Sequence, residues 1–247
     1  MFKLFSRSAS KSERFDFSQL NTDMHSHLLP GIDDGAEDME HSLELIRGMR
    51  ALGYKKLITT PHILWDMYKN THEIILEKLA QVQDAVKEAG IDVEIQAAAE
   101  YFLDEHVEEL LRDKVPLLTV SGKMVLTEFS MAFPPMNIKE VLFEMQMQGY
   151  QPIIAHPERY AYLERNKEFY GELRDLGCLF QLNLLSFGGH YGRSVVDLAQ
   201  YLLKNGYYNL IGTDLHHNGH LEGLQHFAMP SSLKKLIDEG KIVNARL

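Results

Sequence analysis

The chain has 247 residues, 45% of them hydrophobic and 10% aromatic, which is enough to bury a full core and excludes a disordered chain. Its 25 Lys and Arg against 35 Asp and Glu give a formal charge of -10, which argues against nucleic acid as a partner. The single cysteine, Cys178, excludes an internal disulfide framework and a thiolate zinc site, and we expect it to be a buried small hydrophobic residue.

Residues 1–20 are expected to form a flexible, Ser-rich N-terminal arm, and residues 21–247 a single domain. The arm has basic residues but no apolar stretch followed by a small-residue cleavage site, so it is not typical of a secretory signal. No apolar run approaches the ~20 residues that span a bilayer, so we expect no stable membrane insertion.

Short apolar or β-branched segments recur about every 30 residues, which is the length of one strand, one crossover helix and two loops. We predict strands in seven segments: 23–29, 56–63, 93–102, 123–131, 152–160, 178–186 and 209–217.

The segments between them carry a helical period. Apolar residues at 39, 43, 46, 49 and 52 form one stripe, and those at 75, 79, 82 and 86 form another. Buried strands that alternate with helices indicate a parallel sheet. We predict an α/β fold, a distorted (β/α)7 TIM-like barrel, with an open doubly wound sheet as the alternative.

Ligand-type residues stand at the ends of six of these segments, where barrel proteins build their active sites. Charged groups there are costly to desolvate unless they are paired or bind metal. The predicted metal ligands are His25, His27, Asp34, His62, Glu100, Glu128, His156, Asp214 and His216.

The spacing H-x-H in "DMHSHLLPGIDDGA" has a mechanical reason. Residues i and i+2 of a strand project to the same side and can bind one ion, and D-x-H at 214–216 repeats the pattern. Nine ligands exceed what one zinc needs and suffice for two or three divalent ions, among which Mn, Fe and Zn suit mixed imidazole and carboxylate ligands.

Three further residues are candidates for substrate binding. Arg159 lies three residues beyond His156 and is expected to bind an anionic group, with a salt bridge to Glu158 or Glu164 as the alternative. Trp65 and Tyr68 follow His62 and could form an aromatic wall beside the metals, although Trp65 could equally pack under its loop.

The set "DMHSHLLPGIDDGA", "TTPH", "AAAEYF", "LTEFSM", "IIAHPERY" and "GTDLHH" resembles the polymerase and histidinol phosphatase (PHP) superfamily. Within it, the chain is most similar to bacterial manganese-dependent protein-tyrosine phosphatases of capsule and exopolysaccharide synthesis. The resemblance spans about residues 22–217 and implies the PHP barrel with three metal ions, Mn first, with Fe, Zn and Mg as alternatives.

The same resemblance implies individual roles. His25, His27, Glu100 and Asp214 would hold one ion; Glu100 would bridge to a second, held also by Glu128 and His156; and Asp34, His62 and His216 would hold the third. Arg159 matches the family's phosphate-binding arginine and would act in catalysis, as a metal-bridging hydroxide attacks phosphorus in line. The implied substrate is phosphotyrosine on a cognate tyrosine kinase in the cytoplasm.

Other functions compete with this one. The nearest is a histidinol-phosphate or other small-molecule phosphatase of the same superfamily, and the next is a metal-dependent amidohydrolase, which also begins with H-x-H. A metal-binding regulatory domain would lack some ligands, and none is missing. A cysteine-nucleophile phosphatase is excluded because Leu184 stands six positions after Cys178, where an arginine would be required.

Overall fold

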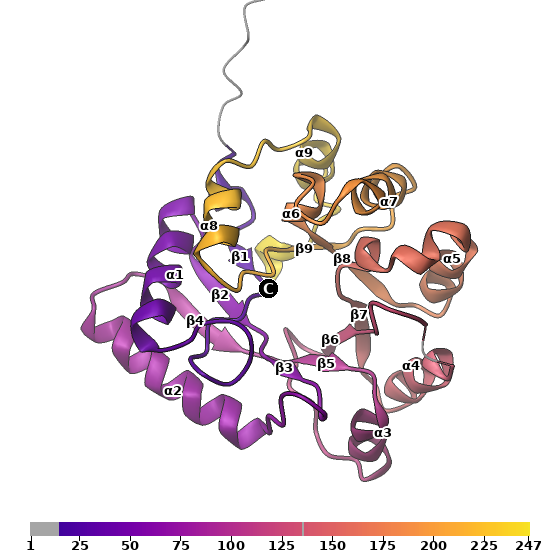
Figure 1. Ribbon diagram of the computed structural model, residues 1–247, viewed down its shortest axis with the longest axis horizontal. Helices are drawn as coiled ribbons and strands as arrows, with labels where there is room; N and C mark the ends of the chain where they lie inside the picture. Colours follow the sequence, from indigo (N-terminus) through magenta and orange to yellow (C-terminus); the bar gives the residue numbers. More distant parts are fainter. Residues whose placement is uncertain (1–14, 135) are drawn as a thin grey trace, which may run out of the picture.

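The computed structural model describes residues 15–134 and 136–247, and its helices surround a central set of strands (Figure 1). Every pairing between the named strands is parallel. One sheet has the order β1 (Thr22–Asp23), β2 (Lys56–Thr59), β4 (Glu94–Ala97), and the other has the order β3 (His62–Ile63), β5 (Glu100–Phe102), β6 (Met124–Glu128), β7 (Gln151–Ile154), β8 (Leu179–Asn183), β9 (Leu210–Gly212).

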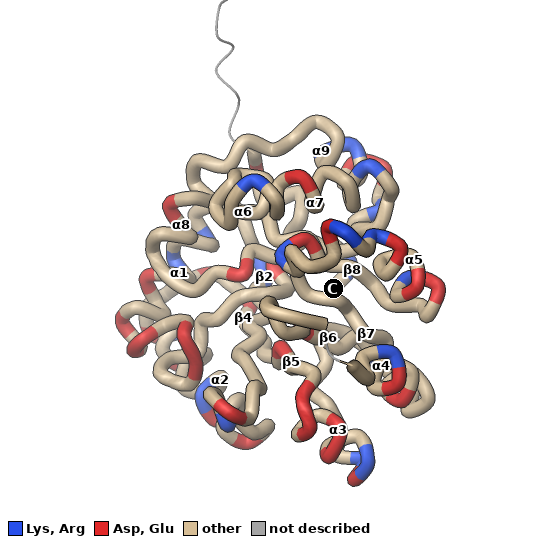
Figure 2. The backbone as a smooth tube through the Cα atoms, turned by 45° about the vertical axis from the view of Figure 1, so that its right-hand side comes forward, with Lys and Arg blue, Asp and Glu red and all other residues tan. Residues whose placement is uncertain are grey.

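Helices connect most of these strands, as parallel pairing requires. The α-helices are α1 (Met39–Leu52), α2 (His72–Glu88), α3 (Glu105–Arg112), α4 (Ile138–Met147), α5 (Glu168–Asp175), α6 (Leu184–Phe187), α7 (Arg193–Lys204), α8 (Asn218–Gln225) and α9 (Ser231–Asp238). Four short 3-10 helices accompany them: η1 (Phe17–Gln19), η2 (Pro157–Arg159), η3 (Ala161–Arg165) and η4 (Asn244–Arg246). Most Lys, Arg, Asp and Glu positions lie along the outer helices (Figure 2).

Six of the seven predicted segments contain whole strands or most of one, whereas in the first, 23–29, only Asp23 lies in a strand and Ser26 forms an isolated bridge to Leu215. Two other segments are divided. Segment 56–63 forms β2 and then β3, and segment 93–102 forms β4 and then β5. Pro61 lies at the first break and has no N–H to donate to a sheet ladder. Single backbone bonds continue across the breaks, from Ala98 N to Thr59 O (2.9 Å) and from Glu100 N to Pro61 O (3.1 Å).

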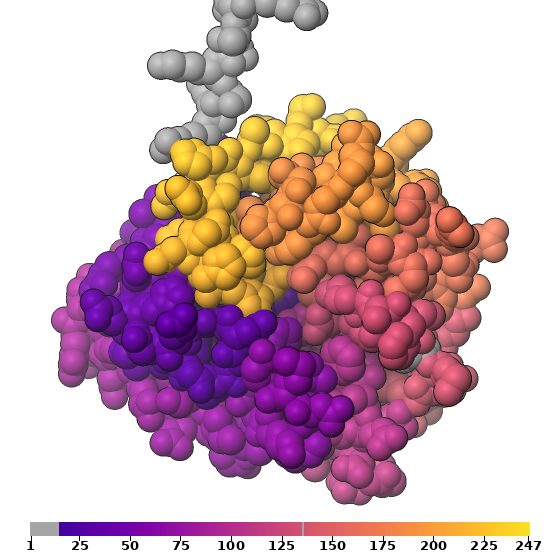
Figure 3. Space-filling view, in the orientation of Figure 1, coloured from indigo at the N-terminus to yellow at the C-terminus, as the bar shows by residue number. Residues whose placement is uncertain are grey.

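The end of the last strand lies beside the end of the first. Asp214 N donates to His25 O at 2.8 Å, and His27 N donates to Leu215 O at 2.9 Å. Segments from opposite ends of the chain are therefore neighbours in the fold. At the surface, too, the C-terminal part of the chain covers the part that follows the first strand, with α8 against α1 (Figures 1 and 3).

The predicted helical stripes are confirmed where they meet the strands. In α1 the buried residues include Ile46 and Met49, and the helix ends at Gly53, whose φ of 114° favours glycine. The helix therefore buries one apolar face and leaves its polar face exposed.

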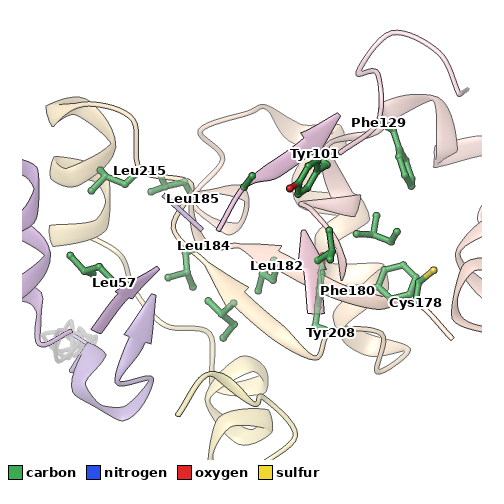
Figure 4. Packing of buried hydrophobic residues seen from close by; sticks show 14 of the residues in the cluster. Leu57, Tyr101, Phe129, Cys178, Phe180, Leu182, Leu184, Leu185, Tyr208 and Leu215 are labelled. Atoms are coloured by element: carbon green, nitrogen blue, oxygen red, sulfur yellow. The ribbon is translucent and has the colours of Figure 1, made fainter. Parts of the chain in front are cut away.

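Two apolar clusters hold the architecture together. The larger joins the helices to the outer sides of the strands, and Figure 4 shows part of it, with Phe180 and Leu182 of β8 packed near Cys178. Cys178 is buried as predicted, and burial raises the pKa of its thiol to about 12. The smaller cluster comes mainly from the strands and the residues next to them: Met24, Ile58, Ala98, Val120, Leu126, Ile153, Ala155 and Leu210.

The predicted arm at residues 1–20 needs a correction. Residues 1–14 lie outside the described residues, but Phe17 and Leu20 are buried, with 2% and 1% of their surface exposed. Apolar side chains at these two positions pack into the larger cluster, so the folded part begins before residue 21. Among the described residues, no helix has both the length and the apolar composition needed to cross a membrane.

Candidate metal centre

The nine predicted metal ligands come together at one end of the strands. Parallel strands bring their carboxyl ends to the same side, and each ligand stands at such an end or in the loop that follows. Glu128 is the last residue of β6, His156 follows β7, and His62 and Glu100 lie in β3 and β5, which continue the directions of β2 and β4. The geometry therefore joins residues spread over positions 25 to 216.

One group of side chains forms the deepest part of the cluster and comprises His25, His27, Glu100 and Asp214. His25 Nε2 lies 3.1 Å from Glu100 Oε2 and 3.3 Å from Asp214 Oδ1. His27 Nε2 lies 3.4 Å from the same Glu100 oxygen. All four residues are buried, so their nitrogens and oxygens face one another rather than water.

A second group lies nearer the surface and comprises His27, Asp34, His62 and His216. Asp34 Oδ1 is 3.5 Å from both His62 Nε2 and His216 Nε2. Asp34 is half-exposed, and the side chains of His62 and His216 are each 12% exposed. This edge of the cluster is open to a ligand.

The third group joins the first two through Glu100. Glu100 Oε1 is 3.1 Å from His156 Nε2, and Glu128 Oε1 is 3.7 Å from that nitrogen. His62 Nδ1 also lies 3.6 Å from Glu128 Oε2, and His62, Glu100 and Glu128 form a possible ligand set of their own. Glu100 thus contacts all three groups, as a bridging ligand would.

The electrostatics of the cluster fit divalent cations. Burial favours the neutral form of Glu100, but the charges of His25 and His62 outweigh it and hold the pKa well below its ordinary value. Burial, followed by the charge of Glu100, raises the pKa of Glu128 well above its ordinary value. Buried carboxylates this close are stable as anions only beside positive charge, which metal ions supply.

The imidazoles fit the same role. Burial, with the charge of Arg159, lowers the pKa of His156 to about 4, so this ring is neutral and able to bind a metal at neutral pH. Among the described residues, buried His62 Nδ1 has no hydrogen-bond partner, although Glu100 Oε2 is only 3.2 Å away. A nitrogen and a carboxylate oxygen in this arrangement fit an ion better than a hydrogen bond.

Two partners that orient the ligands were missed from the sequence. Asp33 Oδ2 lies 2.8 Å from His27 Nδ1, and Gln181 Oε1 lies 2.9 Å from His25 Nδ1. Such bonds to the second ring nitrogen direct the first one at the metal. The sequence did carry a signal for the role of Asp33. Asp33 and Asp34 are adjacent, so one carboxylate could bind metal while the other holds a ligand in place.

Gly35 explains why the first loop can pass so close to His27. A Cβ atom at this position would lie 2.2 Å from His27 O, closer than atoms can approach. Ala36 N also donates to His27 O at 3.0 Å, and Gly35 N donates to Asp33 Oδ1 at 3.0 Å. The "DDG" sequence is therefore a compact turn as well as a source of ligands.

Two ligands have strained backbones. His156 has a φ of 30° and Asp214 a φ of 52°, in the left-handed region that residues other than glycine rarely adopt. Each lies two residues beyond the end of a strand, β7 for His156 and β9 for Asp214, where the chain turns. Strain of this kind persists only when surrounding contacts enforce it and is concentrated at functional sites.

Arg159 reaches the cluster from η2 and pairs with neither Glu158 nor Glu164. Its Nη1 donates to Asp214 Oδ2 at 2.6 Å. Glu158 is instead fully buried and accepts hydrogen bonds from Ser186 Oγ, Tyr208 Oη and the backbone N of Asn183. The salt bridges predicted as the alternative for Arg159 are therefore wrong.

A cavity of about 270 Å³ opens over the cluster. Its polar lining includes Arg159 and six of the predicted ligands, and its apolar lining consists of Leu64, Met67, Tyr68, Phe102, Phe129 and Met131. The ring of Tyr68 lies parallel to that of His62, with centroids 5.7 Å apart. A metal-binding floor thus meets an apolar and aromatic wall.

Trp65 does not contribute to that wall. Its indole stacks on His106 with ring centroids 3.7 Å apart and 16° between the planes, and it is not among the cavity-lining residues. The backbone N of Trp65 donates to Asp104 at the start of α3, which turns this part of the loop toward the helix. The sequence-based assignment of Trp65 to substrate binding is therefore corrected, whereas Tyr68 lies where predicted.

Parallel strands surrounded by helices, with a buried cluster of imidazoles and carboxylates at their carboxyl ends, define an α/β protein with a candidate centre for several metal ions. The family model described as capsular polysaccharide synthesis, CpsB/CapC, matches residues 21–228. The chain belongs to this family.

Curated relatives include the tyrosine-protein phosphatase CpsB of Streptococcus pneumoniae, which is 32% identical over 200 residues, covering 78% of this chain and 82% of CpsB. The tyrosine-protein phosphatase YwqE of Bacillus subtilis is 28% identical over 194 residues, covering 78% of this chain and 76% of YwqE. Both findings confirm the resemblance inferred from the six motifs.

Solved structures agree. A chain from the crystal structures of YwqE from Bacillus subtilis and CpsB from Streptococcus pneumoniae, described as unique metal-dependent tyrosine phosphatases, has a TM-score of 0.77 at 26% identity and covers 89% of this chain and 92% of that chain. An amidohydrolase from Mycoplasma synoviae has a TM-score of 0.51 at 13% identity, covering 93% of this chain and 89% of that chain. This second likeness concerns the fold alone.

Proposed function

We propose that this chain is a metal-dependent protein-tyrosine phosphatase that hydrolyses the phosphomonoester of phosphotyrosine. The observation that carries the proposal is the cavity in which Arg159 and an apolar wall with Tyr68 face the cluster of ligands. Tyrosine phosphatases among the relatives, CpsB and YwqE, support the same reaction.

Three divalent ions, Mn first, would occupy the cluster. One would be held by His25, His27, Glu100 and Asp214, a second by Glu100, Glu128 and His156, and a third by Asp34, His62 and His216. The contacts described above support each set. When bound, such ions supply Lewis acidity and the activation of water at neutral pH.

The protein's own groups would bind and orient the phosphoryl group. Arg159 lines the cavity and carries N–H donors that suit phosphoryl oxygens, so it would take up charge as the P–O bond breaks. Tyr68 and its apolar neighbours would pack against the phenol ring and exclude water from it. A shorter phosphoserine would gain less from this wall, which favours phosphotyrosine.

We also propose the finer description of the fold as a single domain with the distorted (β/α)7 barrel of the PHP superfamily. Seven strand segments and the bonds that join the last of them to the first support it. The substrate would be a cognate tyrosine kinase of capsule or exopolysaccharide synthesis, with the reaction in the cytoplasm, as the family resemblance implies.

One comparison of substrates tests the function. The values of kcat/KM for a phosphotyrosine peptide, a phosphoserine peptide and histidinol phosphate should be measured on protein reconstituted with Mn²⁺. We expect the phosphotyrosine peptide to be hydrolysed at least about tenfold better than the phosphoserine peptide. Activity should vanish with a chelator and return with Mn²⁺.

Other outcomes point to other functions. A preference of several orders of magnitude for histidinol phosphate would replace the protein phosphatase with a small-molecule phosphatase of the same superfamily. Amide hydrolysis without phosphatase activity would favour an amidohydrolase. Full activity in protein shown metal-free by elemental analysis would contradict the role of the metals altogether.

A further inference from the structure

The sixth strand segment contributes no ionisable ligand to the cluster, and its side chains do something else. Asn183 is the last residue of β8, and Tyr191 lies in the connection between α6 and α7. Asn183 contacts Asp214 and Tyr191 lies over Arg159, and neither side chain is among the predicted ligands.

Arg159 is held on one edge and covered on one face. Its Nη1 donates to Asp214 Oδ2 at 2.6 Å, and its Cζ lies 4.4 Å from the centroid of the Tyr191 ring. Over residues 15–134 and 136–247, no second protein acceptor bonds to the guanidinium, and its side chain is 24% exposed on the cavity. Its remaining N–H groups are therefore available to a ligand.

Tyr191 is itself fixed in place by the end of β8. Asn183 Nδ2 donates to Tyr191 Oη at 3.2 Å and to Asp214 Oδ2 at 2.9 Å. The Asn183 side chain is immobilised in turn, because its Oδ1 accepts from Leu185 N at 2.9 Å. One amide thus ties the phenol and the carboxylate that flank Arg159 to the same strand.

We propose that Tyr191 is a positioning residue that holds the plane of the Arg159 guanidinium so that its free N–H edge faces the phosphoryl group. An aromatic face attracts the guanidinium and restricts its rotation, so less side-chain entropy is lost when the phosphoryl oxygens bind. Tyr191 acts through Arg159 and touches neither substrate nor metal. The inference rests on the proposed function, since it assumes that Arg159 binds phosphate.

Two substitutions separate the ring from the hydroxyl. Tyr191→Leu removes the aromatic face, whereas Tyr191→Phe keeps it and loses only the bond from Asn183. In Mn²⁺-loaded protein, we expect Tyr191→Leu to weaken binding of inorganic phosphate, measured by calorimetry, about three- to twentyfold. Tyr191→Phe should bind phosphate within about twofold of the unmodified chain. The metal content should be the same in all three.

A double-mutant cycle tests whether Tyr191 acts through Arg159. We expect Tyr191→Leu to have no further effect on phosphate affinity in the background of Arg159→Ala. Equal losses in both backgrounds, or a loss in Tyr191→Phe as large as in Tyr191→Leu, would overturn the inference, because the ring would then not act on the guanidinium. Unchanged phosphate affinity in Tyr191→Leu would do the same.

The failure of this inference is distinguishable from the failure of the proposed function. If the unmodified, metal-loaded chain hydrolyses aryl phosphate and binds phosphate but Tyr191→Leu behaves identically, only the role of Tyr191 is wrong. If the unmodified chain neither hydrolyses aryl phosphate nor binds phosphate, the proposed function is wrong and the role of Tyr191 with it.

Discussion

His27 Nδ1 and Asp33 Oδ2 lie 2.8 Å apart, and this contact directs the other ring nitrogen of His27 at Glu100 and Asp214. Asp33 is also tied to the next strand, because His62 N donates to the same carboxylate oxygen at 3.1 Å. A single side chain thus orients one predicted ligand and fixes the backbone of another.

We expect Asp33→Asn to weaken Mn²⁺ binding about 10- to 100-fold, because the neutral amide holds the His27 ring less firmly and lowers its basicity. Metal affinity can be measured by titration calorimetry. Asp84→Asn, which changes an exposed residue of α2, is the matched control and should leave the affinity unchanged. Equal affinities in the two variants would remove Asp33 from the metal centre.

Glu100 and Arg159 should separate metal binding from catalysis. Glu100→Gln should lose bound metal and turnover together, because Glu100 contacts all three groups of ligands. Arg159→Ala should keep its metal content while losing about 2 to 4 kcal/mol of transition-state stabilisation. Elemental analysis and kcat/KM on an aryl phosphate measure both effects. Unchanged kinetics in Arg159→Ala would limit Arg159 to its bond with Asp214.

The aromatic wall can be tested with two residues of the same loop. Tyr68→Ala should narrow the preference for phosphotyrosine over phosphoserine peptides about three- to tenfold, because Tyr68 lines the cavity. Trp65→Ala removes a larger ring that stacks on His106 outside the cavity, and it should leave the preference intact. The ratio of the two kcat/KM values is the measurement. A larger effect from Trp65 than from Tyr68 would reverse this assignment.

Metal binding should release protons. Burial lowers the pKa of His25 and His27, but neighbouring carboxylates outweigh it and raise both pKa values above 6.5, so these rings hold protons to a higher pH than free histidine. An ion must displace those protons, and its affinity therefore rises as pH rises through this range. Calorimetry of Mn²⁺ binding in buffers of different ionisation enthalpy measures the release. If the affinity for Mn²⁺ did not change between pH 6 and 8, the predicted proton release would be wrong.

Asp23 should make the fold less stable at higher pH. Burial raises the pKa of Asp23 to about 7, although it accepts bonds from Thr213 N and Oγ1. The folded chain keeps this proton between about pH 4 and 7 while the unfolded chain loses it, so stability falls as pH rises across that window. Asp23→Asn removes this loss of stability, because the amide does not ionise.

The free energy of unfolding of Asp23→Asn, relative to that of the unmodified chain, should rise by about 2 to 4 kcal/mol between pH 4 and 8, because one pKa unit corresponds to about 1.4 kcal/mol. Urea unfolding of metal-free protein at both pH values gives the difference, and Asp92→Asn, on the surface, is the control. If the difference in the free energy of unfolding did not change with pH, Asp23 would not be the group that holds this proton in the folded chain.

The sequence predicts which residues gather at the candidate centre because their positions depend on local pattern. H-x-H, D-x-H and single residues at strand ends are visible without knowledge of how the strands pack. Partners such as Gln181 and Tyr191 could not be predicted in the same way, because their roles depend on how distant segments approach one another. Gln181, for example, meets His25 across 156 positions of the chain.

The prediction that Trp65 faces the metals was wrong because it relied on proximity in the sequence. Proximity in sequence to His62 indicated that it faces the metals, but the loop turns at this residue, whose backbone N bonds to Asp104. The local turn of the loop decides which of its two aromatic rings, that of Trp65 or that of Tyr68, lines the cavity. Pattern in the sequence does not fix that turn, because loops lack the periodicity that orients residues in strands and helices.

The bonds between Asp214 and His25 also bear on how the protein is made. His25 and His27 leave the ribosome early, whereas Asp214 and His216 follow nearly 190 residues later. A nascent chain that ends before β9 has only part of each ligand group to which Asp214 or His216 belongs. The two groups that contain Asp214 or His216 can therefore form only after the segment that follows β9 has joined the segment that follows β1, whereas His62, Glu100 and Glu128 are all present earlier. A nascent chain thus gains its candidate ligand groups in stages, and the complete centre forms only with the last strand.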